Sequence, residues 1–225
     1  RILVVGGGYI AVEFAGVFAH LGSRTTLLHR GDRLLRGFDD ELRDALGEAY
    51  AKRMDLRLNR TVERLDQAGS GIRVTLDDGS TLEVDQVLTA TGRRPNIAGL
   101  GLEAVGIAPD ARGAIPVDAF SRTRVPSIYA VGDVTDRVNL TPVAIREGQA
   151  FADTVFGNRP ACVDHRLIPT AVFSLPNIGT VGLSEEDAKG KGYKVKVFES
   201  RFRPMKLTLT GCQEKTLMKL VVDAD

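Results

Sequence analysis

A run of three glycines between an apolar strand and a helical pattern constrains this chain more than any other feature. The residues ILVV at 2–5 are typical of a central parallel strand, and the glycines at 6–8 follow directly. Apolar residues then recur at helical spacing up to Gly22, and TTLLH at 25–29 predicts a second strand. This order of elements is that of a βαβ unit.

The glycine loop fits the pattern G-x-G-x-x-G/A, in which Ala11 takes the last position. Gly6 permits the tight turn, Gly8 lets the backbone approach a pyrophosphate, and Ala11 allows close packing of helix on strand. The helix N-terminus offers free N–H groups and partial positive charge to phosphates. Because the motif follows a strand and opens a helix, we expect a dinucleotide site; the alternative is a glycine-rich turn without a ligand.

The end of the second predicted strand indicates which dinucleotide is bound. Units that bind NAD commonly place an acidic residue there, to accept from the ribose 2′-OH. This chain instead reads LLHRGDRLLR, with Arg30, Arg33 and Arg36 around a single acid, Asp32. Guanidinium groups suit a 2′-phosphate, so Arg30 and Arg36 predict NADPH. The alternative is a solvated basic loop.

Further local patterns extend the fold. Asp39 and Asp40 are suited to begin a helix, and TVERLDQ, IRVTL and TLEV predict an antiparallel meander before the apolar strand QVLTATG. A second α/β stretch is expected around SIYAVGDV at 127–134, with Asp133 at the carboxyl end of a strand.

The remaining elements are predicted by their capping residues. Thr141 and Pro142 are suited to be the N-cap and first residue of a helix. After residue 168, β-rich segments surround one short helix that Ser184 and Asp187 are suited to cap.

Composition excludes several classes of function. The chain has 225 residues, and 30 Lys and Arg against 29 Asp and Glu give no global attraction to nucleic acid or membrane. There is no apolar run of membrane-spanning length. Cys162 and Cys212 lie far apart without metal-like spacing, which favours a cytoplasmic location. The ends at Arg1 and KLVVDAD favour the interior of a longer protein.

Several segments together resemble the flavin-dependent pyridine nucleotide-disulfide reductases, in the order of that family and along the whole chain. The resemblance implies an α/β fold with three parts: a Rossmann-like nicotinamide domain at 1–95, with a parallel sheet and an antiparallel β-meander, the second part of a FAD domain at 96–165, and a truncated α+β dimerisation domain at 166–225. The segments are GGGYIAVEFAG, RGDRLLRGFD, ATGRRPN, IYAVGDV, LTPVAIREGQ, IPTAVFSLPNIGTVGLSEEDA and FRPMKLTLTG.

The resemblance also implies roles for individual residues. Tyr9 corresponds to a ring that covers the flavin until the nicotinamide displaces it, and Glu13 to an acid that pairs with a lysine beside the flavin. Asp133 corresponds to a contact of the ribityl–phosphate part of FAD, and the helix at Thr141 points its positive end at the flavin. The alternatives are an aromatic over the first helical turn for Tyr9, a solvated Glu13, and a loop aspartate that bonds its own backbone.

Arg93 is expected either to face a cofactor or to form an ion pair between domains. His20, His29 and His165 are expected to be surface or polar-boundary histidines. The expected catalytic residues are Tyr9 and Glu13, and the expected cofactor-binding residues are Gly6, Gly8, Tyr9, Ile10, Ala11, Glu13, Arg30, Arg36, Gly92, Arg93, Gly132, Asp133, Leu140 and Thr141.

The resemblance implies an electron relay from NADPH to FAD, then to a redox disulfide and a substrate disulfide, in a homodimer formed through the C-terminal domain. Members that reduce glutathione disulfide are the best match; those that reduce trypanothione disulfide, dihydrolipoamide dehydrogenases, and a non-catalytic NADPH-binding module are the alternatives. The family's redox cysteine pair and acid–base histidine fall outside this chain, and Cys162 and Cys212 do not match them. We therefore expect the isolated piece to have no disulfide reductase activity.

Overall fold

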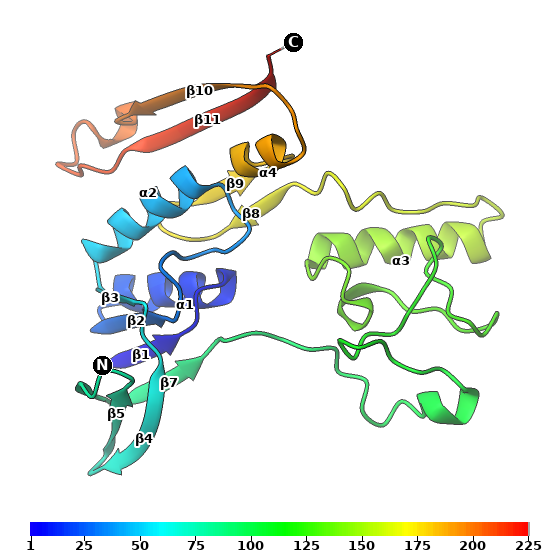
Figure 1. Ribbon diagram of the computed structural model, residues 1–225, viewed down its shortest axis with the longest axis horizontal. Coiled ribbons are helices and arrows are strands. Elements are labelled where there is room, and N and C mark those ends of the chain that lie inside the picture. The colour runs from blue at the N-terminus through cyan, green and yellow to red at the C-terminus, as the bar shows by residue number, and fades with distance from the viewer. Residues whose placement is uncertain (225) are drawn as a thin grey trace. The chain divides into compact units, whose positions relative to one another are not determined.

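The computed structural model describes residues 1–224 and places them in two compact units (Figure 1). One unit combines residues 1–92 with the chain from residue 169 onward, and the other is formed by residues 93–168. Asp225, the last residue of the expected dimerisation domain, lies outside the described residues.

The first unit is built on a four-stranded parallel sheet in the order β3-β2-β1-β7. The strands predicted at its centre are confirmed, but β3 has no counterpart in the sequence analysis. Its residues, DLRL, alternate charged and apolar side chains over too short a stretch to stand out. The strands are β1 Ile2–Val5, β2 Thr25–His29, β3 Asp55–Leu58 and β7 Gln86–Thr89.

Helices α1 (Tyr9–His20) and α2 (Asp40–Ala51) contribute to the core on one face of this sheet. Tyr50 is fully buried there, and its hydroxyl donates to the carbonyl of Val12 at 2.8 Å. Burial raises the pKa of Tyr50 to about 12. Asp39 caps α2 by accepting from the N–H of Glu41, at the helix start that the sequence predicts.

The predicted antiparallel meander covers the other face of the sheet. Leu3 and Leu28 point toward it, because alternate residues of a strand face opposite sides. They pack against Val74, Leu76 and Val84 of the meander. Its strands are β4 Val62–Ala68, β5 Gly71–Leu76 and β6 Thr81–Val84.

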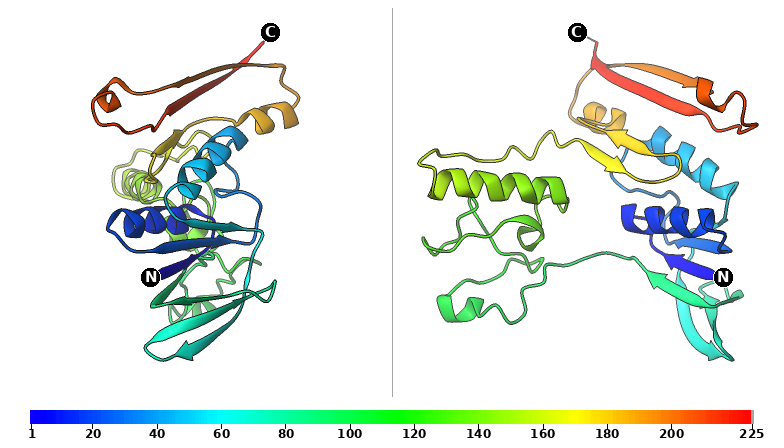
Figure 2. Two further views of the ribbon diagram at one scale, coloured as in Figure 1. Left: turned by 90° about the vertical axis from the view of Figure 1, so that its left-hand side faces the viewer. Right: turned by 180° about the vertical axis from the view of Figure 1, so that it is seen from behind.

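The C-terminal segment of the chain completes the first unit (Figure 2). Val172 and Ile178, from two short strands, join the core that contains Val4 and Ala11. Ser184 caps the short helix, accepting from the N–H of Asp187 at 3.0 Å as predicted. The elements are β8 Thr170–Val172, β9 Ile178–Thr180, α4 Glu185–Gly190, β10 Val195–Phe202, η3 Met205–Leu207 and β11 Thr216–Asp223.

The second unit is mostly irregular and contains one long helix, α3 (Thr141–Val155), with two 3-10 turns, η1 (Leu102–Val105) and η2 (Gly132–Thr135). The prediction of a strand directly before Asp133 is wrong. The backbone at 121–130 pairs through a single bridge between Arg122 and Tyr129, which gives no continuous ladder. Asp133 lies instead in η2.

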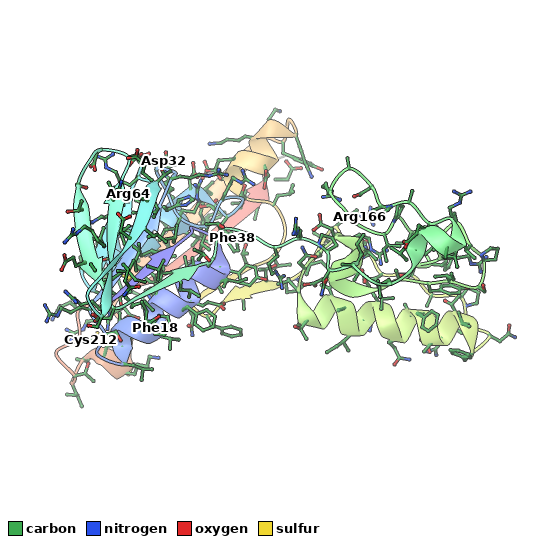
Figure 3. The ribbon with its side chains drawn as sticks, turned by 90° about the horizontal axis from the view of Figure 1, so that it is seen from below. Phe18, Asp32, Phe38, Arg64, Arg166 and Cys212 are labelled. Carbon is green, nitrogen blue, oxygen red and sulfur yellow. The ribbon has the colours of Figure 1, made fainter. Side chains whose placement is uncertain are left out.

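The N-cap expected at Thr141 is wrong. Leu140 is the N-cap of α3, because its carbonyl accepts the first helical hydrogen bond, from the N–H of Ala144. Thr141 is therefore the first residue of the helix. Cys162 and Cys212 are free, and Cys212 lies in the loop between β10 and β11 (Figure 3). Within residues 1–224, no helix is long and apolar enough to cross a membrane.

Candidate cofactor sites

The glycine loop leaves β1 at the edge of the sheet where the parallel strands end. Gly6 has φ +144°, and a Cβ atom there would lie 2.3 Å from the carbonyl oxygen of Ala90. Gly8 is exposed and occupies the N-cap of α1, where no side chain caps the helix and no acidic residue lies in the first turn. The first N–H groups of α1 are therefore left for an anion.

His29, at the end of β2, packs against this loop. A Cβ atom on Gly7 would lie 2.5 Å from its ring, and one on Gly31 would lie 2.8 Å from Nε2. A side chain at either position would displace the His29 ring. Burial, followed by the charge of Arg30, lowers the pKa of His29.

The three arginines beyond His29 differ in their partners. Arg33 forms ion pairs of 2.8 Å with both Asp40 and Asp44 of α2. Arg30 and Arg36 are exposed, and within residues 1–224 no ion pair or hydrogen bond engages their side chains. The two arginines that the sequence analysis assigns to the cofactor are thus the two with free guanidinium groups.

Tyr9, Ile10 and Glu13 lie half-buried on α1. The Glu13 carboxylate accepts from the backbone N–H of Phe173 at 2.8 Å. No lysine pairs with Glu13 within the part of the chain that the structure describes, so its expected lysine partner stays a prediction. Ala11 is fully buried, as close packing of α1 on the sheet requires.

In the second unit, Arg93, Asp133 and the start of α3 come together. Arg93 Nη1 lies 3.0 Å from Asp133 Oδ2, and its Nη2 donates to the carbonyl of Asn139 at 3.1 Å. Leu140 and Thr141 follow directly and begin α3, whose first turn contains no acidic residue. Arg93 therefore makes this pair inside its own unit, and Gly92, with φ +148°, precedes it.

A buried acid beneath this group was missed in the sequence analysis. Glu147 of α3 is 2% exposed; its Oε2 accepts from the N–H of Gly132 at 2.6 Å. Its Oε1 lies 2.9 Å from Arg137 Nη2 and 2.7 Å from His165 Nε2. A signal was available, because Glu147 stands four residues after buried Val143 on the same helical face.

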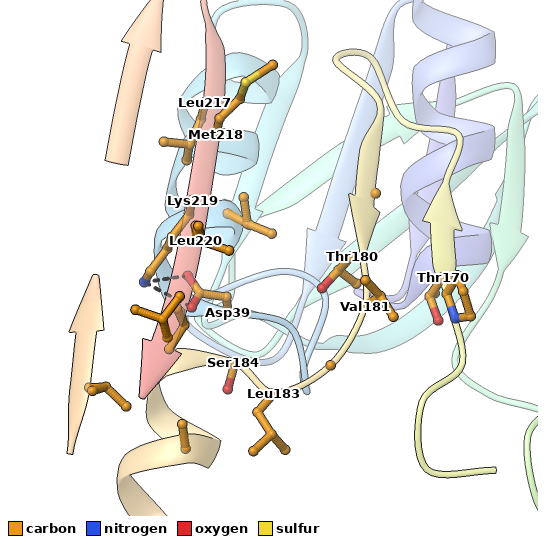
Figure 4. A pocket seen from close by; sticks show the side chains of 18 of the residues that line it. Asp39, Thr170, Thr180, Val181, Leu183, Ser184, Leu217, Met218, Lys219 and Leu220 are labelled. Carbon is orange, nitrogen blue, oxygen red and sulfur yellow. Dashed lines mark hydrogen bonds and ion pairs between the residues drawn. The ribbon is translucent and has the colours of Figure 1, made fainter. Parts of the chain in front are cut away.

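A second buried charge cluster connects α2 with the C-terminal segment, beside a cleft between α2, β9 and β11 (Figure 4). The side chain of Lys219 on β11 is 5% exposed, and its Nζ lies 2.9 Å from Asp39, 3.0 Å from Glu41 and 2.7 Å from Glu185. Burial lowers the pKa of Lys219, but these three carboxylates together outweigh it and raise the pKa above its ordinary value. The cluster connects β11 and α4 to the start of α2 within the first unit.

Two family models match the chain. A model described as "Pyridine nucleotide-disulphide oxidoreductase" matches residues 1–148. A second, described as "Pyridine nucleotide-disulphide oxidoreductase, dimerisation domain", matches residues 168–225.

Relatives that match nearly the whole of this chain include enzymes of two different names. A glutathione reductase of Burkholderia cepacia is 53% identical over 224 residues, which cover 99% of this chain and 50% of the relative. A trypanothione reductase of Trypanosoma congolense is 44% identical over 229 residues, which cover 99% of this chain and 46% of the relative. The chain thus spans about half the length of these relatives.

Solved structures share the fold. RclA of Escherichia coli, described as an HOCl-induced flavoprotein disulfide reductase, gives a TM-score of 0.90 at 31% identity, over 99% of this chain and 51% of that one. LpdA of Mycobacterium tuberculosis gives a TM-score of 0.81 at 31% identity, over 88% of this chain and 43% of that one.

Proposed function

This chain belongs to the pyridine nucleotide-disulphide oxidoreductase family, and from that premise we propose that it is the NADPH-binding part, with a portion of the FAD-binding part, of a glutathione-disulfide reductase. The observation that carries the proposal is the pair of exposed, unpaired arginines, Arg30 and Arg36, beyond a dinucleotide-type glycine loop.

The residues of the first unit fit NADPH. Gly6 makes the tight turn against the backbone of Ala90, and Gly8 leaves room for a pyrophosphate at the open N-terminus of α1. Ile10 and Ala11 belong to the same first turns of α1. Arg30 and Arg36 would hold the 2′-phosphate, since guanidinium groups bind phosphate oxygens through paired hydrogen bonds.

The residues of the second unit fit the phosphate and flavin end of FAD. Asp133 and Arg93 are both partly exposed and held together by their ion pair. The start of α3, at Leu140 and Thr141, has no side-chain cap and directs partial positive charge outward. Gly132 has a positive φ, as does Gly92, the residue of the first unit that directly precedes Arg93.

The two cofactors supply redox chemistry: NADPH gives a hydride, and FAD accepts two electrons and passes them on. In this proposal Tyr9 covers the flavin in the absence of NADPH, and Glu13 pairs with a lysine of the full-length protein. The redox disulfide and the acid–base histidine also belong to the full-length protein. We place it in the cytoplasm as a homodimer, with glutathione disulfide as substrate.

Trypanothione disulfide is the second candidate substrate, because a trypanothione reductase is 44% identical over nearly the whole chain. Steady-state assays of the full-length protein with each disulfide separate the two candidates. The proposal expects the higher kcat/KM with glutathione disulfide, and the reverse order would assign the second substrate.

The cofactor assignment is tested by replacing Arg30 and Arg36 singly with alanine in the full-length protein and measuring equilibrium binding of NADPH and NADH. A charged hydrogen bond contributes about 1.5–3 kcal/mol, so each variant should bind NADPH about 10- to 100-fold more weakly. NADH binding should stay within about twofold, because NADH lacks the 2′-phosphate.

Arg33→Ala is the matched control, since Arg33 is held by Asp40 and Asp44. It should change the affinity for either nucleotide by less than about threefold, the scale of a partly exposed ion pair. Equal losses of NADPH and NADH binding in the Arg30 and Arg36 variants would contradict the assignment.

A further inference from the structure

The most strongly engaged buried acid in the second unit is Glu147. Its carboxylate is 2% exposed and has three partners: the N–H of Gly132 at 2.6 Å, Arg137 Nη2 at 2.9 Å and His165 Nε2 at 2.7 Å. A buried carboxylate is costly unless donors surround it, and here they come from the η2 segment and from the segment that follows α3.

One of these partners is the backbone of the turn that carries Asp133. Gly132 has φ +73°, a conformation that side-chain-bearing residues rarely adopt, and a Cβ atom there would lie 3.1 Å from Ala144 Cβ on α3. The turn therefore lies directly against α3. The Glu147 carboxylate fixes the direction of the Gly132 peptide, and the next residue is Asp133.

The other partners hold the carboxylate in place. The same Nη2 of Arg137 also donates to Ser121 Oγ at 3.0 Å, which holds the guanidinium group in position. His165 comes from the segment that follows α3. With two partners on Oε1, the remaining oxygen, Oε2, is presented to the Gly132 N–H.

We propose that Glu147 is a positioning residue of the flavin site: its buried carboxylate fixes the Gly132 peptide and thereby holds Asp133 against Arg93 at the start of α3. The inference rests on the proposed flavin site and deepens it. Glu147 itself touches no cofactor in this account; it acts through the turn.

The test is FAD binding by the apo form of the full-length protein, with Glu147→Gln compared with wild type by flavin fluorescence. Glutamine has the same shape, but its one carbonyl oxygen cannot accept from Gly132 and from the Arg137 and His165 side at once. We expect FAD affinity to fall at least tenfold. We also expect hydrogen exchange at the Gly132 amide to become faster.

Asp153→Asn is the matched control, because Asp153 lies on the same helix and pairs with Arg159, away from the turn. Its FAD affinity should stay within about twofold of wild type. NADPH affinity, measured on the same samples, should be unchanged in both variants, which shows that the first unit is folded.

If Glu147→Gln binds FAD within twofold of wild type, the positioning role is wrong although the flavin site stands. If wild-type protein binds no FAD, the proposed flavin site is wrong. If Glu147→Gln does not fold, Glu147→Asp decides, since its carboxylate keeps the charge but is one methylene too short to reach the Gly132 N–H and the two partners of Oε1 together. About threefold weaker FAD binding in that variant supports the proposal, and unchanged binding overturns it.

Discussion

Arg30, Arg33 and Arg36 follow one another at intervals of three residues, yet they have different roles in the structure. Arg33 neutralises Asp40 and Asp44 at the start of α2, whereas Arg30 and Arg36 keep free guanidinium groups. The sequence alone assigned Arg30 and Arg36 to the phosphate but did not show what Arg33 pairs with. Only the position of α2 separates the structural one from the two that are available to a phosphate.

Two glycines of the first unit make a matched test of backbone requirements. Gly6→Ala would place a Cβ atom 2.3 Å from the Ala90 carbonyl oxygen at φ +144°, so it should lower the free energy of unfolding by about 3 kcal/mol. Gly47→Ala, inside α2 with open space around it, should raise it by about 0.5–1 kcal/mol. Urea unfolding measures both, and equal effects would contradict this account of the loop.

At the scale of elements, the sequence predicts those whose pattern is local. β1, α1, β2 and the meander are confirmed because alternation, helical spacing and turn residues are all contained in each segment. β3 was missed because it is defined by its pairing with β2 and not by a local pattern. Residues 127–131 do not form a strand because a single bridge, between Arg122 and Tyr129, is their β pairing. Gly6 and Gly8 were readable from their motif. The helical spacing of Glu147 from Val143 indicated its burial, but its partners could not be predicted, because Gly132 lies 15 residues before it and His165 lies 18 residues after it.

The cluster that joins α2, α4 and β11 is an element-scale contact with a clear consequence. Lys219→Met would leave the carboxylates of Asp39, Glu41 and Glu185 without their shared buried cation. The free energy of unfolding should fall by about 3 kcal/mol. Lys189→Met is the control, since exposed Lys189 also pairs with Glu185 but should change stability by less than about 1 kcal/mol. Equal effects of the two changes in thermal or urea unfolding would refute the distinction.

The same cluster predicts an acid dependence of stability. Lys189 and then Lys219 lower the pKa of Glu185 from 4.5 to about 2. A carboxyl group with a lowered pKa stabilises the fold fully above its unfolded pKa, and this contribution is lost as the pH falls toward the folded pKa. Stability should therefore fall between about pH 4.5 and 2. The slope should be shallower for Glu185→Gln in urea titrations at a series of pH values, and an unchanged slope would contradict this role of Glu185.

At the scale of the whole molecule, the first unit is assembled from both ends of the chain. Val172 and Ile178 fill the same core as Val4, Ala11 and Tyr50, although the entire second unit lies between them in the sequence. Neither the glycine-loop half nor the C-terminal segment completes this core by itself. The expected domain boundaries, after residues 95 and 165, stay a prediction, while the core of the first unit is filled by residues from both sides of the second unit.

The energetic importance of this shared core can be tested by shortening one buried side chain. Val172→Ala removes two methyl groups from a fully buried site, so it should lower the free energy of unfolding by about 2 kcal/mol and speed amide exchange in α1. Val181→Ala, at a valine that is 62% exposed, should stay within about 0.5 kcal/mol of wild type. Exchange in α1 that does not respond to Val172→Ala would show that the two ends are energetically independent.

The hydrogen bond from the Phe173 amide to Glu13 spans 160 residues of sequence. A ribosome that adds about 5–20 residues per second leaves α1 waiting on the order of 10–30 seconds for that partner. During this interval the apolar positions that Val172 and Ile178 later cover are open to other chains. Slowing synthesis after residue 92 should therefore increase the loss of the newly made glycine-loop half to aggregation.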